Sequence, residues 1–406
     1  MTSIDMVKTH AEQTGALAGE RILGSINTGK PGPTVVFFGG IHGNEPAGVE
    51  ALSEVFRTLQ EEGITLDRGS LIGIRGNLPA LIRKERFLDH DLNRIWSRRR
   101  LESVLAKPEE ERSCEEKELV LIYGWIQELL KTHSPPFYFI DLHTTSSKTK
   151  PFITINDSII NRFFSREFPV PVILGIEEYL EGPLLSYINE LGYVALGFES
   201  GTHQDPAAVR NAVDFIWLTL CYTELLSAHP GKQENFERLD RAAESDHDFY
   251  EVFYRHELSE THTFKMKDGF ESFQPLPKGT VLGSDEGGPI EMQKKGILFM
   301  PLYQKQGEEG FFLIRKTPAW ALKLSAKLRK WKIHETLIRL PGVSWADKEH
   351  NALIVNLNVA RFMNRPIFHL LGYRSRQRDQ THLIISNREH KARNEDYRNT
   401  FWFSED

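Results

Sequence analysis

The sequence predicts an α/β fold, with a mixed, largely parallel sheet flanked by helices and a smaller C-terminal β-rich domain. Up to about residue 230, short apolar runs rich in β-branched residues alternate with amphipathic stretches. This alternation is typical of helices that cover a parallel sheet. From residue 249 to residue 316, short apolar runs are separated by the turn-forming clusters "PLPKG" and "SDEGGP", which favours an all-β module. We therefore expect one domain over residues 1–245 and a second over residues 246–406.

The expected elements of the first domain follow in chain order. Apolar runs bounded by turn residues predict strands at Thr34–Phe38, Ser70–Arg75, Tyr138–Leu142, Phe152–Ile155, Val170–Leu174 and Tyr193–Phe198. Apolar periodicity predicts helices near Pro46–Leu59, Cys114–Lys131 and Pro206–Leu226. Pro46 and Pro206 suit the first turn of a helix, where a missing N–H has no cost.

Composition limits the class of protein. A chain of 406 residues can bury the core of one large and one smaller domain. Its net charge of -6 argues against a general nucleic-acid binder. No apolar stretch approaches the roughly 18 residues needed to span a bilayer, and the first twenty residues lack the pattern of a secretory signal. Cys114 and Cys221 form no C-x-x-C pair, which fits a reducing compartment. We expect a cytoplasmic protein with no nucleic-acid or membrane partner.

Two features of the C-terminal domain stand apart from its strands. The stretch "TPAWALKLSAKLRKW" (317–331) predicts a basic amphipathic helix, which suits an acidic membrane or partner. The ordinary alternative, which we favour, is that its Leu and Trp side chains pack on their own domain. The tail (385–406) is charged and then aromatic at Phe401, Trp402 and Phe403, and the sequence leaves its docking place open.

The stretch "FFGGIHGNEPAG" (37–48) places a histidine and a glutamate three residues apart in a glycine-rich bend. The bend follows an apolar run, and in open α/β sheets ligand sites form beyond the carboxyl ends of the strands. His42 and Glu45 are therefore candidate metal ligands, and a salt bridge or an accidental pair are the alternatives. The spacing differs from the H-E-x-x-H motif, whose two histidines are four residues apart on a helix.

A third candidate ligand ends another predicted strand, in "FYFIDLHTTSS" (137–147). Asp141 and His143 are two residues apart, so they share a face if the strand continues that far. A carboxylate beside a ligating histidine fixes its tautomer and raises its basicity. Two histidines and one glutamate with an open position form a catalytic zinc site, although the same ligands suit other divalent ions. The alternative for His143 alone is an ordinary strand-end histidine.

A catalytic base is expected at the end of a third strand, in "YVALGFESGTHQDP" (193–206). Glu199 in this position can take a proton from a metal-activated water and pass it to a leaving amine. The alternative is that Glu199 caps the helix that follows. The serine of "GFESG" is displaced by one place from the G-x-S-x-G pattern of a nucleophile elbow.

Candidate anion-binding residues lie in "RFLDHDLNRIW" (86–96). Arg86 and Arg94 are suited to bidentate carboxylate recognition and to stabilising an oxyanion. The alternative for either arginine is a surface ion pair with Asp89 or Asp91.

Together these residues resemble a known family. "GGIHGNE", "RFLDHDLNR", "DLHTT" and "GFES" occur in the order and rough spacing of the aspartoacylase/succinylglutamate desuccinylase family, a branch of the zinc carboxypeptidase-like metallohydrolases. The resemblance is close over residues 34–205, loose over the β module, and absent after about residue 330. It implies a zinc carboxypeptidase-like fold, with a zinc-hydrolase catalytic domain at residues 1–245. It also implies an amidohydrolase, or deacylase, that removes an acyl group such as acetyl or succinyl from a small anionic N-acyl amino acid.

The resemblance also implies a role for each motif residue. His42, Glu45 and His143 match the ligands of one zinc ion per chain, and Glu199 matches the general acid/base. Arg86 matches the arginine that polarises the scissile carbonyl. The residues matching the pair that holds a substrate carboxylate are Asn93 and Arg94.

Some features depart from the family or stay open. Aspartoacylases close the carboxylate pocket with a tyrosine, whereas "QGEEGFFLIRK" has Phe311 and Phe312, and Tyr303 lies upstream. The acyl group, the amino acid, the oligomeric state (a homo-oligomer is one alternative) and the role of residues 332–406 are open. The competing functions are a metallocarboxypeptidase acting on longer peptides and a non-catalytic binding module with a vestigial site.

Overall fold

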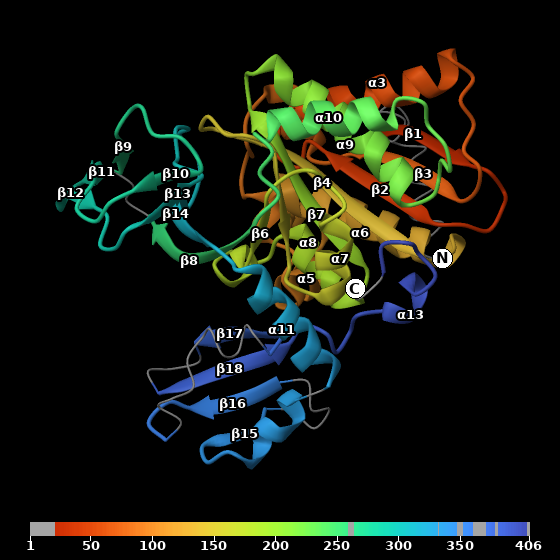
Figure 1. Cartoon of the computed structure of the whole chain (residues 1–406). Helices are drawn as coiled ribbons and strands as arrows, with labels where there is room; N and C mark the ends of the chain where they lie inside the picture. Colours follow the sequence, from red (N-terminus) through yellow and green to blue (C-terminus); the bar gives the residue numbers. More distant parts are fainter. Residues whose placement is uncertain are drawn as a thin grey trace.

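The computed structural model describes residues 21–258, 264–331, 333–346, 352–359, 371–377 and 381–403. The first twenty residues, in which we expected no secretory signal, lie outside this part. Within it, a large mixed sheet has helices on both faces, and two smaller sheets lie beside it (Figure 1). This architecture confirms the predicted fold class.

The main sheet contains eleven strands of the described part of the chain, in the order β1-β3-β2-β4-β7-β5-β6-β8-β14-β13-β10. These are β1 (Ile22–Asn27), β2 (Thr34–Gly39), β3 (Ser70–Arg75), β4 (Phe137–Thr145), β5 (Phe152–Ile155), β6 (Val172–Leu174), β7 (Val194–Thr202), β8 (Phe249–Glu257), β10 (Gln274–Leu276), β13 (Gly296–Phe299) and β14 (Glu309–Lys316). Strands β3, β2, β4 and β7 pair in parallel. Their carboxyl ends therefore lie along one edge of the sheet, where ligand sites form in folds of this kind.

The strands after residue 245 continue the same sheet. β8 pairs in parallel with β6, and β14, β13 and β10 follow by antiparallel pairing. The predicted division of the chain between residues 245 and 246 stays a prediction. One small sheet consists of β9 (Lys265–Met266), β11 (Val281–Asp285) and β12 (Gly288–Glu291). The other consists of β15 (Val343–Trp345), β16 (Ala352–Asn356), β17 (Tyr373–Gln377) and β18 (His382–Asn387).

Helices cover the main sheet because its central strands are apolar on both faces. The helices of the described residues are α3 (Ala47–Glu61), α4 (Leu78–Arg83), α5 (Arg98–Ala106), α6 (Cys114–Thr132), α7 (Ile159–Ser165), α8 (Leu184–Leu191), α9 (Pro206–Tyr222), α10 (Lys232–Ala242), α11 (Ala319–Lys330) and α13 (Asn394–Tyr397). In β2, Val35 and Phe37 face α3 and α9, whereas Val36 and Phe38 face α6 and α8. No helix in the described ranges has both the length and the apolar character that crossing a bilayer requires.

The predicted strands and helices of the first domain are all present. The bounds of β3 and β5 match the prediction, and ends of the other elements differ from it by one to four residues. β7 continues to Thr202, four residues beyond the predicted end, so Glu199 lies within the strand rather than at its end. Helix α10 was not predicted, because its apolar face is narrow. Within that helix, Asn235 and Leu239 are buried.

Helix α11 packs differently from the expectation. Trp320 and Trp331 are exposed, by 68% and 65%, so the prediction that its tryptophans pack on their own domain is wrong. Leu322 and Leu328 do pack against apolar clusters. The buried polar face carries Arg329, which helical periodicity of apolar residues does not reveal.

The C-terminal tail docks on the main domain. The Tyr397 hydroxyl donates to the carbonyl oxygen of Phe137 and accepts from the N–H of Val194. Trp402 is buried and packs edge-on against Tyr138. The last described residues therefore complete the core of the first domain.

A buried ion-pair network joins α11 and the residues after β18 to the first domain. Asp157 contacts the guanidinium groups of Arg162, Arg329 and Arg388, and its Oδ2 lies 2.9 Å from Arg329 Nη2. Arg329 also donates to Glu389. Burial alone would raise the pKa of Asp157, but the three arginines hold it far below its ordinary value.

Removing the Asp157 charge should therefore destabilise the protein. We expect Asp157→Asn to lower the free energy of unfolding by about 3–5 kcal/mol at pH 7, because it leaves buried arginines without their carboxylate. A depressed pKa contributes stability that is full above about pH 4 and is lost as the pH falls. The difference in the free energy of unfolding between the wild type and the variant should consequently become smaller below about pH 4. Urea unfolding at pH 7 and pH 3 measures both effects.

The matched control is Asp248→Asn. Asp248 pairs with Lys316 where both side chains are largely exposed, so its removal should cost less than about 1 kcal/mol. Equal losses for the two variants would contradict a structural role for the network.

Candidate functional site

A tight bend between β2 and α3 places the first two candidate ligands. Gly40 has a φ of +71°, which favours glycine. A Cβ on Gly43 would lie 2.1 Å from the carbonyl carbon of Ala80, so any other residue there would displace the neighbouring backbone. The N–H of Glu45 donates to the carbonyl oxygen of His42 at 3.2 Å. The bend therefore brings both side chains to the carboxyl edge of the sheet.

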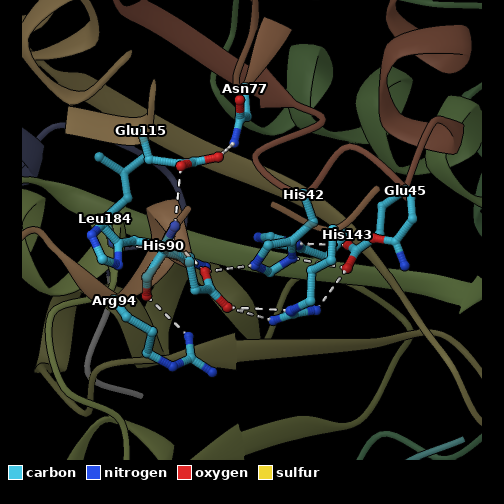
Figure 2. Close-up of polar contacts among 12 residues, drawn as sticks. His42, Glu45, Asn77, His90, Arg94, Glu115, His143 and Leu184 are labelled. Atoms are coloured by element: carbon cyan, nitrogen blue, oxygen red, sulfur yellow. Dashed lines mark hydrogen bonds and ion pairs between the residues drawn. The ribbon is translucent and has the colours of Figure 1, made fainter. Parts of the chain in front are cut away.

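Three donor groups converge at this edge (Figure 2). Glu45 Oε1 lies 2.8 Å from Nδ1 of His42, and Glu45 Oε2 lies 2.9 Å from Nδ1 of His143. One donor atom from each of the three residues lies within 4.8 Å of the others, and all three side chains are buried. His143 comes from β4, so neighbouring parallel strands build the cluster.

A carboxylate holds the outer nitrogen of each histidine. Nε2 of His143 lies 2.6 Å from Oδ2 of Asp141, and Nε2 of His42 lies 3.1 Å from Oδ1 of Asp91. Such partners fix the ring orientation and leave Nδ1 free to bind a metal. Sequence reasoning proposed this task for Asp141 but treated Asp91 only as an ion-pair partner of an arginine.

The buried charges around the cluster fit a divalent cation. Glu45, Asp91, Asp141 and Glu199 are four buried carboxyl groups, and Arg86 is the buried arginine that faces two of them. Burial alone would raise the pKa of Glu45, but His42 and His143 hold it well below its ordinary value. Buried anions need compensation, and a donor set of two imidazoles and one carboxylate suits zinc. It also suits other divalent transition metals.

Glu199 lies beside this cluster on β7, in register with His143 on β4. Burial raises the pKa of Glu199 to about 8, and the nearby carboxylate of Glu45 adds to the shift. Its Oε2 is buried and has no hydrogen-bond partner among the described residues. A carboxylate with a raised pKa and a free oxygen can accept and return a proton near neutral pH.

The loop after α4 is shaped by one buried carboxylate. Glu115, at the start of α6, accepts backbone N–H bonds from Leu88 at 2.8 Å, Asp89 at 3.0 Å and His90 at 3.1 Å. It also accepts from the side chain of Asn77 at 3.1 Å (Figure 2). Glu115 therefore orders the segment that carries the two candidate arginines.

Replacing Glu115 should disorder this loop. We expect Glu115→Ala to leave three backbone donors without partners, since a buried unsatisfied donor costs about 1–3 kcal/mol. Any activity of the site should fall by more than tenfold, since misplacing a group by about 1 Å can cost about 100-fold. Amide hydrogen exchange over residues 86–94 measures the ordering directly. Glu102→Ala, at an exposed ion pair, is the control and should leave exchange in the loop unchanged.

The candidate anion-binding residues reach the same pocket. Arg86 donates to Oδ2 of Asp91 through Nε and Nη2 and lies 3.4 Å from Oε1 of Glu45. This ion pair with Asp91 is buried, so it differs from the surface pair considered as the alternative. Asn93 Oδ1 accepts the N–H of Leu184, which holds the loop against α8.

The pocket that these residues line has a volume of about 120 Å³. Its lining includes His42, Glu45, Arg86, Asn93, Arg94, His143 and Glu199. The β-rich part of the chain supplies one wall, with Met300, Leu302, Gln304, Glu309 and Phe312. The site is therefore bounded on one side by residues from this part of the chain.

Among the described residues, no tyrosine lines the pocket. The Tyr303 hydroxyl donates to the carbonyl oxygen of Lys267, and Tyr303 does not line the pocket. Phe312 lines it, whereas Phe311 packs in a separate apolar cluster. The aromatic side chain at this wall is therefore a phenylalanine without a hydroxyl group.

Sequence reasoning missed several residues of the site. His203 follows β7, and its ring bonds to Thr144 Oγ1 and Gln304 Oε1. Gln304 also accepts from Asn44, so it joins the ligand-bearing bend to the β-rich wall. His203 lies in a motif that the sequence analysis quoted, whereas no local pattern marks Gln304 or Glu309.

Comparisons with known proteins agree with this geometry. Residues 31–167 match the model of the succinylglutamate desuccinylase/aspartoacylase catalytic domain. The chain is 35% identical to a succinylglutamate desuccinylase of Photorhabdus laumondii over 137 residues, which cover 33% of this chain and only 40% of that protein. It is 27% identical to the enzyme of that name from Pseudomonas syringae pv. tomato, over 63% of this chain and 73% of the relative. The fold is similar to that of a succinylglutamate desuccinylase/aspartoacylase from Rhodobacter sphaeroides, with a TM-score of 0.52, 18% identity, and coverage of 71% and 87% of the two chains.

Proposed function

We propose that the chain is a metal-dependent hydrolase of linear amides, because residues 31–167 match the catalytic-domain model of the succinylglutamate desuccinylase/aspartoacylase family and the chain is similar to curated succinylglutamate desuccinylases. The proposed reaction removes an acyl group, such as acetyl or succinyl, from the nitrogen of a small N-acyl amino acid that brings an anionic carboxylate. The observation that carries the proposal is the buried convergence of His42, Glu45 and His143 beside Glu199.

The three converging residues would hold the metal, which we propose to be one zinc ion per chain. Bound there, zinc would supply Lewis acidity that lowers the pKa of a water molecule. Asp91 and Asp141 orient the two imidazoles through their outer nitrogens. The excess of buried carboxylates supports a cation of charge two rather than one.

Each remaining residue has a separate proposed task. Glu199 takes a proton from the attacking water and gives it to the leaving amine, as its raised pKa allows. Arg86 donates hydrogen bonds to the carbonyl oxygen as negative charge develops there. Asn93 and Arg94 hold the substrate carboxylate, for which a guanidinium offers paired N–H donors.

The alternatives have less support. A metallocarboxypeptidase acting on longer peptides would need an open cleft, whereas Met300, Leu302 and Phe312 close one side of this pocket. A vestigial binding module would not need a base beside the donor cluster, yet Glu199 lies there. We place the reaction in the cytoplasm, a reducing compartment that suits the free thiols of Cys114 and Cys221.

The experiment is a hydrolysis screen of the zinc-loaded full chain. N-acetyl, N-succinyl and N-formyl amino acids are offered in parallel with a short peptide series, and released amine is measured. We expect turnover of acyl amino acids and at least tenfold slower turnover of peptides. Preferential cleavage of peptides would replace the deacylase with a carboxypeptidase.

A further inference from the structure

The arginine that we assign to the substrate carboxylate is already paired within the protein. Arg94 Nη2 lies 3.1 Å from Oε2 and 3.3 Å from Oε1 of Glu309, the first residue of β14. Both side chains are about nine-tenths buried and line the pocket. A carboxylate of the protein thus lies where a substrate carboxylate is expected.

Neighbouring carboxylates stabilise the charged form of Arg94 in this pair. Burial alone would lower the pKa of Arg94, but the carboxylates of Glu309 and Asp91 outweigh burial and raise it above its ordinary value. Among the described residues, the other cation near Glu309 is Arg255, whose Nη1 lies 4.0 Å from Oε1 of Glu309. Arg255 also binds Glu257 at 2.8 Å, so it is poorly placed to replace Arg94.

A lone carboxylate therefore cannot bind Arg94 without a penalty. It would separate Glu309 from its partner and leave a buried anion uncompensated, which is costly in a protein interior. Among the described residues that line the pocket, the lysine or arginine side chains are Arg86 and Arg94, and Arg86 is held by Asp91 and Glu45. A second carboxylate on the substrate would find no further cation in this lining.

A ligand that brings both charges avoids the penalty. Its carboxylate can take the place of Glu309 on Arg94, and its cation can take the place of Arg94 on Glu309. One buried ion pair before binding becomes two after it, and no buried charge is left without a partner. Among amino acids acylated on the α-nitrogen, those with a basic side chain carry both groups.

We propose that Glu309 is a specificity-determining residue, and that the chain acts on N-acyl derivatives of amino acids with a cationic side chain. This inference rests on the proposed deacylase function and narrows its substrate class. Glu309 pairs with the side-chain cation while Arg94 pairs with the carboxylate.

Equilibrium binding tests the inference apart from catalysis. The zinc-loaded full chain is titrated calorimetrically with ornithine, norleucine and glutamate, the amino acids that deacylation would release. Ornithine and norleucine share the α-ammonium and α-carboxylate groups and have side chains of equal length, so they differ only in the charge of the side chain. We expect ornithine to bind about tenfold or more tightly than norleucine and about 100-fold more tightly than glutamate, the scale of effect for a buried charge pair.

Variants assign the preference to one residue. In Glu309→Gln, the affinity for ornithine should fall by about tenfold and that for glutamate should rise, because Arg94 then lacks a carboxylate. The matched control is Glu308→Gln, the same change at the exposed neighbouring residue, which should keep the wild-type order of affinities. Circular dichroism checks the folding of both variants, and if Glu309→Gln does not fold, the wild-type order alone decides.

Two results would overturn the inference. One is a wild type that binds norleucine or glutamate as tightly as ornithine, or that does not bind ornithine. The other is a folded Glu309→Gln variant with an unchanged preference. Hydrolysis of the three Nα-acetyl derivatives is measured in parallel, since failure to hydrolyse any of them would refute the deacylase while the binding order still decides the role of Glu309.

Discussion

Glu199→Gln is expected to abolish hydrolysis while leaving the metal bound. Glutamine keeps the size of the side chain but cannot accept the proton of the attacking water, so the rate should fall by about 10²–10⁴-fold. Glu199 is not among the three converging donor residues, so the metal content should equal that of the wild type. Amine release and elemental analysis of the same sample measure the two effects. Activity within about tenfold of the wild type would assign the base to another group.

The same substitution should stabilise the protein once the metal has been removed. The pKa of Glu199 is raised to about 8, so burial penalises its charged form in the folded state. The penalty is absent below the unfolded pKa of about 4.3 and grows as the pH rises toward 8. Glu199→Gln should therefore unfold at a higher temperature than the wild type at pH 9 and at the same temperature at pH 4. Glu190→Gln, an exposed glutamate on α8, should change neither activity nor stability.

His143→Ala should remove the metal together with the activity. Loss of one of three ligands leaves His42 and Glu45, which cannot complete a catalytic site of the usual three protein ligands. We expect zinc content to fall from about one per chain to near zero after dialysis. Because a ligand that binds only the folded state stabilises it by about 4 kcal/mol at a thousand times its Kd, zinc should raise the melting temperature of the wild type but not of the variant.

The control for His143→Ala is His203→Ala. His203 lies in the same pocket, but its ring nitrogens bond to Thr144 and Gln304 rather than to the donor cluster. The variant should keep its zinc and the zinc-induced rise in melting temperature. Full zinc retention by His143→Ala would contradict the proposed ligand set.

Much of the fold and the centre of the site could be predicted from local patterns. The sequences of β2, β4 and β7 contain continuous apolar runs, because parallel strands are buried on both faces. Each run leads into a polar motif, and parallel strands bring their carboxyl ends to one edge. This is why His42, Glu45, His143 and Glu199 could be grouped before their positions in space were known.

The rest of the site depends on contacts between distant parts of the chain. Glu309 reaches Arg94 across 215 residues, and Gln304 reaches Asn44 across 260 residues. No local sequence pattern around Glu309 or Gln304 indicates these contacts. Arg329 illustrates the same limit in the fold, since its buried guanidinium pairs with Asp157 and Glu389, which lie far from it in the sequence.

The central claim is that His42, Glu45 and His143 hold a metal on which amide hydrolysis depends. The most direct measurement is amine release from an acyl amino acid that the screen identifies, by the full chain before chelation, after chelation and after zinc is returned. We predict loss of activity on chelation and recovery with about one equivalent of zinc per chain. An unchanged rate in chain that elemental analysis shows to be free of metal would contradict the claim.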